Sequence, residues 1–247
     1  MRILITNDDG IDSPGIAALV EAMLADHEPF VVAPSENRSG VSHAITTNEA
    51  ITIERREGGR VAHYACSGTP ADCVFLGSTV LSSRPDLVIS GINWGPNLAD
   101  DVNYSGTVAG AIEAALLDIP AIAVSLAAEH DRASDLQWGA AAEIARRALV
   151  ELAANGFDPQ YYWNLNVPNL PLARIRGTAL TRLGRKRICG RVVGEERDGS
   201  TSYFRAWESP FETDRDREGT DIAAVHGGFA SLTPLVLDRT ARALLSA

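Results

Sequence analysis

The chain begins Met1-Arg2-Ile3-Leu4-Ile5-Thr6-Asn7-Asp8-Asp9-Gly10, and this stretch decides the fold. Residues 3–6 are a continuous run of aliphatic and β-branched side chains, which is typical of a strand that is buried on both faces of a sheet. In an open parallel sheet, ligands bind beyond the carboxyl ends of the strands, which is where Asp8 and Asp9 stand. Because adjacent carboxylates repel each other, the pair predicts a bound cation, and the simplest candidate is a metal ion. An ordinary Asp-Gly turn is the alternative.

Strands and helices alternate along the first two thirds of the chain. Short apolar runs predict buried strands at residues 30–33, 87–89 and 121–124, and amphipathic spacing predicts a helix over residues 136–152. This alternation predicts an α/β fold with a doubly wound, mainly parallel sheet. Further elements are expected as a hairpin over residues 51–65, as helices beginning at Pro14, Pro70 and Thr107, and as a final helix over residues 239–245.

The last third of the chain changes character. It contains short β-like pieces, a cluster of arginines and a very polar stretch, so we expect a β-rich extension that we interpret as an oligomerisation arm. The 247-residue chain is then one domain. Its parts are an α/β core (1–168), the extension (169–228) and a C-terminal return (229–247).

The composition limits the class of protein. The formal net charge of −10 argues against a protein that grips long nucleic acid through its phosphates. No run of about 18 apolar residues is present, so we expect no membrane-spanning segment. Cys66, Cys73 and Cys189 form neither a CxxC pair nor a zinc-site cluster, which indicates thiols that act as small core residues in a reducing compartment. We therefore expect a cytoplasmic protein.

Lys186 is the only lysine. The sequence therefore has no P-loop lysine, and a Schiff-base mechanism would depend on Lys186 alone. This residue lies in the exposed-looking run Arg185-Lys186-Arg187, and we interpret the cations over residues 182–191 as a solvated or interface-facing surface. Guidance of longer phosphorylated substrates, such as polyphosphate, is the weaker alternative.

Two later segments bring polar side chains to the same predicted edge of the sheet. Ser39 follows the second strand, and Asn93 follows the strand predicted at residues 87–89. With Asp8 and Asp9 they form a set of oxygen ligands that suits Mg²⁺ or Mn²⁺ better than zinc. For Ser39 alone, a turn or a helix cap is the ordinary explanation.

Ser105-Gly106-Thr107 immediately precedes an apolar helix. Because the start of a helix offers unpaired N–H groups and a positive dipole end, this segment predicts a phosphate site, with a simple Ser/Thr cap as the alternative. A metal ion beside a phosphate site suits metal-assisted hydrolysis of a phosphoester. A nucleotide or phosphate sensor that binds without turnover would use the same groups, so that alternative stays open.

Five segments in order carry a family resemblance. They are Ile5-Thr6-Asn7-Asp8-Asp9-Gly10-Ile11, Arg38-Ser39-Gly40, Ser67-Gly68-Thr69-Pro70-Ala71-Asp72-Cys73, Ser90-Gly91-Ile92-Asn93 and Tyr104-Ser105-Gly106-Thr107-Val108. With these segments the chain resembles the SurE family of stationary-phase survival proteins, which act as metal-dependent 5′/3′-nucleotidases. The resemblance runs to about residue 168 and resumes at residues 219–221 and 231–235.

The resemblance implies a fold, an activity and a set of site residues. The fold is a Rossmann-like α/β core with a C-terminal β-rich extension that mediates homodimers or homotetramers. The substrate is a nucleoside 5′-monophosphate, with 3′-monophosphates and short polyphosphate as further candidates, and each subunit holds one divalent ion, Mg²⁺ or Mn²⁺. By position, the metal ligands are Asp8, Asp9, Ser39 and Asn93, of which the two aspartates are catalytic, and the phosphate contacts are Asn97, Ser105, Gly106 and Thr107. Ala99 departs from the family pattern, which usually has glycine there.

Two other enzyme classes fit the first turn poorly. A Rossmann oxidoreductase needs G-x-G-x-x-G there, and two carboxylates would repel its pyrophosphate. A haloacid-dehalogenase-like phosphatase would need a second aspartate two positions after its nucleophile, and from Asp8 that position is Gly10.

Overall fold

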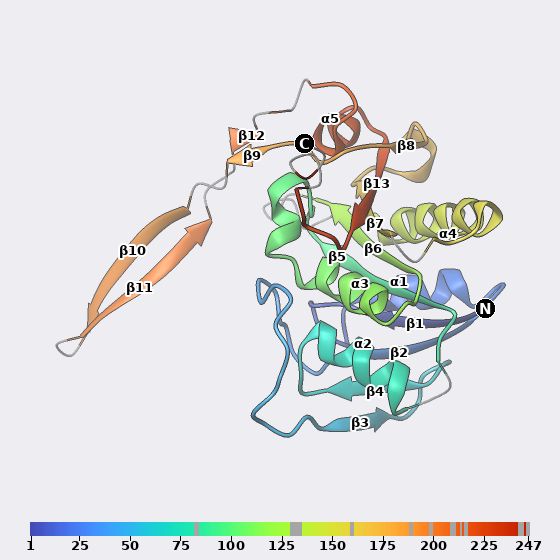
Figure 1. Cartoon of the computed structure of the whole chain (residues 1–247), viewed down its shortest axis with the longest axis horizontal. Helices are drawn as coiled ribbons and strands as arrows, with labels where there is room; N and C mark the ends of the chain where they lie inside the picture. Colours follow the sequence, from blue (N-terminus) through green and yellow to red (C-terminus); the bar gives the residue numbers. More distant parts are fainter. Residues whose placement is uncertain are drawn as a thin grey trace.

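The structure is a computed structural model that describes most of the chain (Figure 1). The residues it leaves undescribed are 82–83, 129–134, 159–160, 188–189, 198–199, 208–210, 213, 215–216, 242–244 and 246–247. Cys189 therefore lies outside the described residues, as does part of the helix expected over residues 239–245. The described residues at 239–241 are not helical, so the helix prediction is wrong for that part.

One nine-stranded sheet organises the described part of the chain, in the order β3-β4-β2-β1-β5-β6-β7-β13-β8. The strands from β4 to β7 are parallel, β3 and β13 run antiparallel to β4 and β7, and β8 is parallel to β13. The doubly wound, mainly parallel sheet predicted from the sequence is thus confirmed. The strands are β1 (Arg2–Thr6), β2 (Glu28–Pro34), β3 (Ile53–Arg56), β4 (His63–Cys66), β5 (Leu87–Trp94), β6 (Ala121–Ala127), β7 (Tyr161–Pro168), β8 (Thr178–Leu180) and β13 (Ala230–Val236).

Helices cover both faces of this sheet. On one face α1 packs against α4, and on the other α2 packs against α3. The helices are α1 (Pro14–Met23), α2 (Pro70–Thr79), α3 (Gly106–Leu116), α4 (Trp138–Asn155) and α5 (Asp221–His226), with short 3₁₀ turns η1 (Ala99–Asn103) and η3 (Leu172–Arg174). None of the described helices is long and apolar enough to cross a membrane.

The alternation of side chains along β1 explains why its run is continuously apolar. Ile3 and Ile5 are buried in the core beneath α1 and α4, whereas Leu4 is buried in the opposite core with Val108 of α3. Both faces of β1 are therefore dry, and its carboxyl end is held between β2 and β5. This central position brings the turn after β1 beside the turn after β2 and the end of β5.

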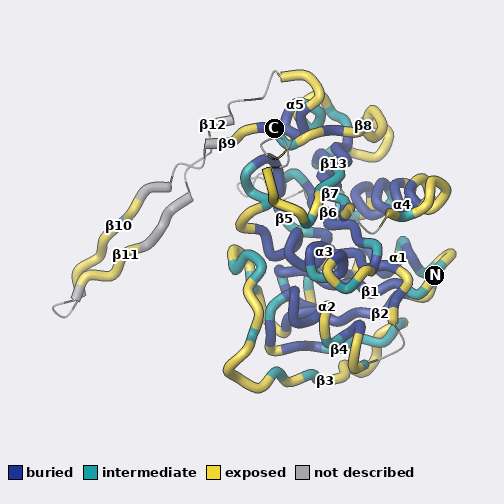
Figure 2. Tube along the Cα trace, viewed as in Figure 1, coloured by how far each residue is buried: buried dark blue, intermediate teal, exposed yellow. Residues whose placement is uncertain are grey.

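The C-terminal third adds a β-rich extension, as predicted (Figure 1). Two long antiparallel strands, β10 (Gly190–Arg197) and β11 (Ser200–Trp207), form a hairpin that extends away from the sheet. The hairpin residues whose burial is described are largely exposed to solvent (Figure 2). Two short paired strands, β9 (Lys186–Arg187) and β12 (Phe211–Glu212), form the base of this hairpin, which we call the arm base.

Candidate active site

Asn7 shapes the turn that carries the two aspartates. Its Nδ2 donates hydrogen bonds to the carbonyl of Gly10 (3.0 Å) and to Oγ of Ser13 (2.7 Å), and its Oδ1 accepts from the Gly10 N–H (3.2 Å). Gly10 has φ +106°, a value that residues with a side chain rarely adopt. Ser13 also caps the start of α1, which begins at Pro14 as predicted. The turn is therefore tied to the helix that follows it.

Asp8 lies against the start of α3. The Thr107 hydroxyl donates a hydrogen bond to Asp8 Oδ1 (2.5 Å), and the Asp8 residue is only 3% exposed. A Cβ on Gly106 would lie 2.8 Å from Asp8 Cβ and 2.9 Å from its Oδ2, so only glycine allows this approach. The predicted metal ligand and the predicted phosphate segment thus touch each other.

Asp9 is held by the end of β5. Its Oδ2 accepts a hydrogen bond from the Trp94 N–H (3.0 Å), and burial raises the pKa of its carboxyl. The contact joins positions 85 residues apart in the chain. It also places Asn93, the neighbour of Trp94, at this edge of the sheet.

Burial disfavours the ionised form of the Asp8 carboxyl group. Its pKa is raised from 3.8 to about 6: burial is the largest cause, the hydrogen bond from Thr107 opposes the rise, and the neighbouring Asp9 adds to it. Both carboxylates are thus destabilised in their charged forms when nothing positive accompanies them. A divalent cation would relieve both effects, so this pair suits a metal site.

The loop after β2 meets the same turn. The backbone N–H of Arg38 donates to the Asp8 carbonyl (2.7 Å), and the N–H of Ile11 donates to the Pro34 carbonyl (2.8 Å). Ser39 follows Arg38, is exposed, and has its own N–H bound to Oδ1 of Asn37 (2.9 Å). These contacts bring Ser39 to the edge of the sheet that carries Asp8.

Asn93 stands within β5, although the sequence predicted it beyond the strand. The strand continues to Trp94, and its pairing with β6 shifts between Ser90 and Asn93. Asn93 Nδ2 donates to the Gly95 carbonyl (2.8 Å), which turns its amide so that Oδ1 remains as the oxygen it can offer to an ion. Within the described residues, no three His, Cys, Asp or Glu side chains form a metal cluster, so an ion at Asp8 and Asp9 would have to draw its further ligands from other groups, such as neutral oxygens.

The predicted phosphate residues divide into two groups. Ser105 caps α3 by accepting the Val108 N–H on its Oγ (3.0 Å), and Gly106 and Thr107 follow directly beside Asp8. Asn97 instead reaches β6 and β7: its Nδ2 donates to Ser125 Oγ (2.8 Å), and its backbone N–H donates to Asn166 Oδ1 (2.8 Å). The Thr107 hydroxyl donates its proton to Asp8, whereas the Ser105 hydroxyl accepts from Val108 and keeps its own proton. The Ser105 hydroxyl and the first backbone N–H groups of α3 are therefore the direct donors to an anion.

Some residues that hold the predicted site residues in place were not predicted from the sequence. Asn164 and Asn166 both donate to the Asn97 carbonyl (2.8 and 3.1 Å), and they alternate along β7 with apolar neighbours. That alternation of asparagines in a buried strand was a readable signal of a polar network. The Trp94 N–H on Asp9 had no such signal, because a backbone donor leaves no trace in the sequence.

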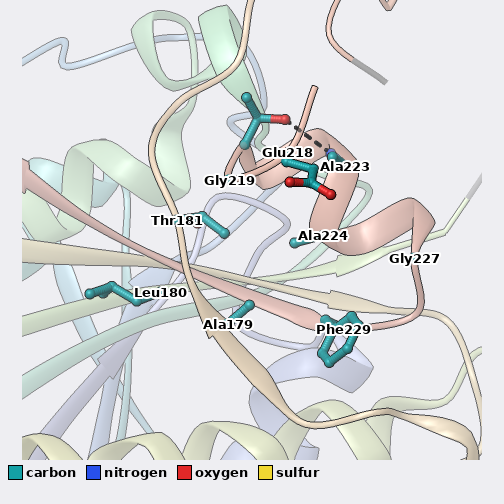
Figure 3. A pocket seen from close by; sticks show the side chains of 10 residues that line it. Ala179, Leu180, Thr181, Glu218, Gly219, Ala223, Ala224, Gly227 and Phe229 are labelled. Atoms are coloured by element: carbon teal, nitrogen blue, oxygen red, sulfur yellow. Dashed lines mark hydrogen bonds between the residues drawn. The ribbon is translucent and has the colours of Figure 1, made fainter. Parts of the chain in front are cut away.

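A cavity of about 240 Å³ lies elsewhere, between β8 and α5 (Figure 3). It is lined mainly by apolar and small groups, among them Ala179, Leu180, Ala223 and Phe229. None of its lining residues belongs to the predicted site.

The raised pKa of Asp8 makes the stability of the metal-free protein depend on pH. Between the ordinary value of 3.8 and the folded value of about 6, the unfolded chain loses the proton while the folded chain keeps it. The free energy of unfolding in EDTA should therefore fall by about 3 kcal/mol as the pH rises through this window, and Asp8→Asn should remove that part of the fall. Denaturant melts of both proteins between pH 4 and 7 measure it. Parallel curves for the two proteins would contradict the burial argument.

The chain is similar to known proteins over almost its whole length. The family model described as "Survival protein SurE" matches residues 3–189. The protein named "5'-nucleotidase SurE" of Pelobacter propionicus is 45% identical over 243 residues, covering 97% of this chain and 95% of that protein. Its counterpart of the same name in Geobacter metallireducens is 42% identical over 247 residues, with 100% and 95% covered.

A solved structure shows the same architecture. The crystal structure of the SurE protein from Aquifex aeolicus matches with a TM-score of 0.84 and 38% sequence identity, covering 99% of this chain and 97% of that chain. Sequence and fold agree on one assignment: the chain belongs to the survival protein SurE family.

Proposed function

We propose that this protein is a metal-dependent phosphomonoesterase that hydrolyses nucleoside 5′-monophosphates to a nucleoside and inorganic phosphate. The observation that carries the proposal is the contact between Asp8 and the start of α3, made by Thr107 and Gly106. It places two carboxylates, which favour a bound cation, beside a helix start, which favours a bound anion. The nucleotide class comes from the relatives, two of which are named 5'-nucleotidases. Hydrolysis of 3′-monophosphates belongs to the same proposal.

Four oxygen-bearing side chains would hold one divalent ion, Mg²⁺ or Mn²⁺, in each subunit. Asp8 and Asp9 supply charge, and Asn93 and Ser39 supply neutral oxygens. A bound ion would polarise the phosphoryl oxygens and offset the negative charge that gathers there. The protein's own part is to hold both carboxylates in a fixed direction, through Thr107 on Asp8 and Trp94 on Asp9, whose hydrogen bonds oppose the rise in pKa that burial causes.

The start of α3 would receive the phosphate. Its first backbone N–H groups and its positive dipole end stabilise the negative charge of the phosphoryl oxygens. Ser105 caps this helix start by accepting the Val108 N–H, and Asn97, the further predicted phosphate contact, is held by Ser125 of β6. The absence of a side chain at Gly106 allows the phosphate-binding turn to approach the ion-binding pair.

Removal of divalent ions should abolish turnover. Phosphate release from a panel of nucleoside 5′- and 3′-monophosphates should be absent in EDTA and return with Mg²⁺ or Mn²⁺.

Asp8→Asn and Asp9→Asn should lower kcat/KM by roughly a hundredfold or more, since each removes a charge that holds the ion. Binding of nucleotides without phosphate release by the wild-type protein would instead support a sensor, and full activity in EDTA would refute the metal.

A methyl group at Gly106 should damage the site without damaging the fold. Gly106→Ala places Cβ against Asp8, so kcat/KM should fall by about tenfold or more. Gly139→Ala is the matched control, because a Cβ there meets nothing within 4 Å. Gly139 lies in the first turn of α4, so this change should keep the rate and should not destabilise the protein. Equal rates for the two variants would show that the close approach at Gly106 is not needed.

We further propose that the β10–β11 hairpin is an oligomerisation arm for a homodimer or homotetramer. Val192 and Tyr203 are 65% and 72% exposed, so the hairpin presents an apolar and an aromatic side chain to solvent. Val192 is opposite Arg205 and Tyr203 is opposite Gly194, so both lie on one face of the hairpin. That face would be covered by a second subunit. The cytoplasmic location expected from the sequence stays a prediction.

Charges on the hairpin should break the oligomer. The double variant Val192→Glu/Tyr203→Glu should sediment as a smaller species than the wild-type protein, because carboxylates cannot be buried in an apolar interface without a partner. Analytical ultracentrifugation at several concentrations measures the mass. The matched control is Val236→Glu, which changes an exposed apolar side chain of β13 in the main sheet. An unchanged mass for the hairpin variant would remove the arm from the interface.

A further inference from the structure

Lys186 is a largely buried cation at the arm base. Its side chain is 9% exposed, and its Nζ forms an ion pair with Asp101 Oδ2 (2.6 Å). Its backbone N–H also donates to Asp100 Oδ2 (2.9 Å). The exposed setting expected from the run Arg185-Lys186-Arg187 is therefore wrong for Lys186, because η1 covers it.

Asp101 connects this lysine to the start of α3. Its Oδ2 accepts the Leu98 N–H (3.2 Å), while its backbone carbonyl accepts the N–H groups of Tyr104 (2.9 Å) and Ser105 (3.1 Å). Ser105 is the N-cap of α3. Asp101 thus holds Leu98, just before η1, and the two residues that follow η1 at Tyr104 and Ser105. Ser105 is also the first residue of the proposed phosphate-binding turn.

A second buried carboxylate fastens the same two segments. Asp221 is fully buried, and it accepts the Ala99 N–H on Oδ2 (2.7 Å) and the Gly184 N–H on Oδ1 (2.8 Å). Ala99 has φ +52°, a left-handed value that the Asp221 bond helps to hold. Residues 184–186 and η1 are therefore joined at three points, of which the Lys186–Asp101 pair is the one between opposite charges.

The burial of the Lys186–Asp101 pair suits a role in positioning the start of α3 better than a contribution to folding stability alone. A surface ion pair is weak because water screens it, and loss of one partner changes little. Here the lysine is shielded, so removal of its charge would leave the Asp101 carboxylate partly buried without a counter-ion. The Asp101 side chain would then rotate toward water. Because this rotation would shift the Asp101 backbone, its carbonyl would move away from the Ser105 N–H.

We propose that Lys186 is a positioning residue for the phosphate-binding turn: its ammonium group holds Asp101, and Asp101 holds the N-cap of α3. The inference deepens the proposed function and rests on it, since it assigns phosphate to that turn. It also makes the arm base part of the active-site support. Seating of the arm would then set the affinity for phosphate.

Lys186→Met tests this role, because it keeps the length of the side chain and removes the charge. In the full-length protein with Mg²⁺, KM for a nucleoside 5′-monophosphate and the inhibition constant of inorganic phosphate should both rise about tenfold, while kcat changes much less. Lys186→Arg should restore most of the affinity. Arg185→Met, which removes a neighbouring exposed cation, should leave both constants unchanged.

A readout without turnover separates the two proposals. Inorganic phosphate should raise the thermal unfolding temperature of the wild-type protein and of Arg185→Met more than that of Lys186→Met. If the wild-type protein releases no phosphate from nucleotides but still shows this pattern, the proposed activity fails and the positioning role stands. If a folded Lys186→Met keeps the wild-type inhibition constant and thermal shift, Lys186 is structural only.

A double-mutant cycle identifies the route. If Lys186 acts through Asp101, the variant Lys186→Met/Asp101→Asn should bind phosphate about as well as either single variant, because the second change removes an interaction that is already lost. Losses that simply add would show that the two residues act independently and would overturn the proposed route. All constants are compared per folded molecule, measured by circular dichroism.

Discussion

The contact between Asp8 and the start of α3 is the interaction on which the rest of the site depends. A buried carboxylate next to a second one is unfavourable unless its directions are fixed and its charge is compensated. Thr107 fixes one oxygen of Asp8, and Gly106 allows the helix to come close enough to do so. This single contact places the proposed ion and the proposed phosphate within one small volume.

The sheet supplies the rigidity that this contact requires. β1 is buried on both faces and paired on both sides, so the turn at its carboxyl end can move little. Backbone donors from the two flanking strands then hold the aspartates: Arg38 follows β2 and binds the Asp8 carbonyl, and Trp94 ends β5 and binds Asp9. Contacts from three neighbouring strands thus hold the two carboxylates close together despite their like charges.

The C-terminal third supports the segment that leads into α3. Asp221 and Lys186 hold η1, and η1 leads into the N-cap of α3. Lys186 and Asp101 form an ion pair, and Asp221 is fully buried and accepts backbone N–H groups, so these contacts favour one arrangement over many. An extension that looks peripheral in the sequence is therefore bonded, through a few polar contacts, to the turn proposed to bind phosphate. Assembly through the hairpin and binding at the site would share this connection.

The sequence by itself determined the local features: the apolar run of β1, the helix starts at Ser13 and Ser105, and the polar turns after the strands. These follow from side-chain patterns and caps that involve near neighbours in the chain. Only the tertiary structure decided that Lys186 is buried, that Asn97 binds β6 and β7, and that Thr107 binds Asp8. Each of those contacts joins residues far apart in the chain, and others, such as the Trp94 N–H on Asp9, use a backbone group that every residue except proline carries. Their partners are chosen by the packing of the sheet and helices, which no local pattern records.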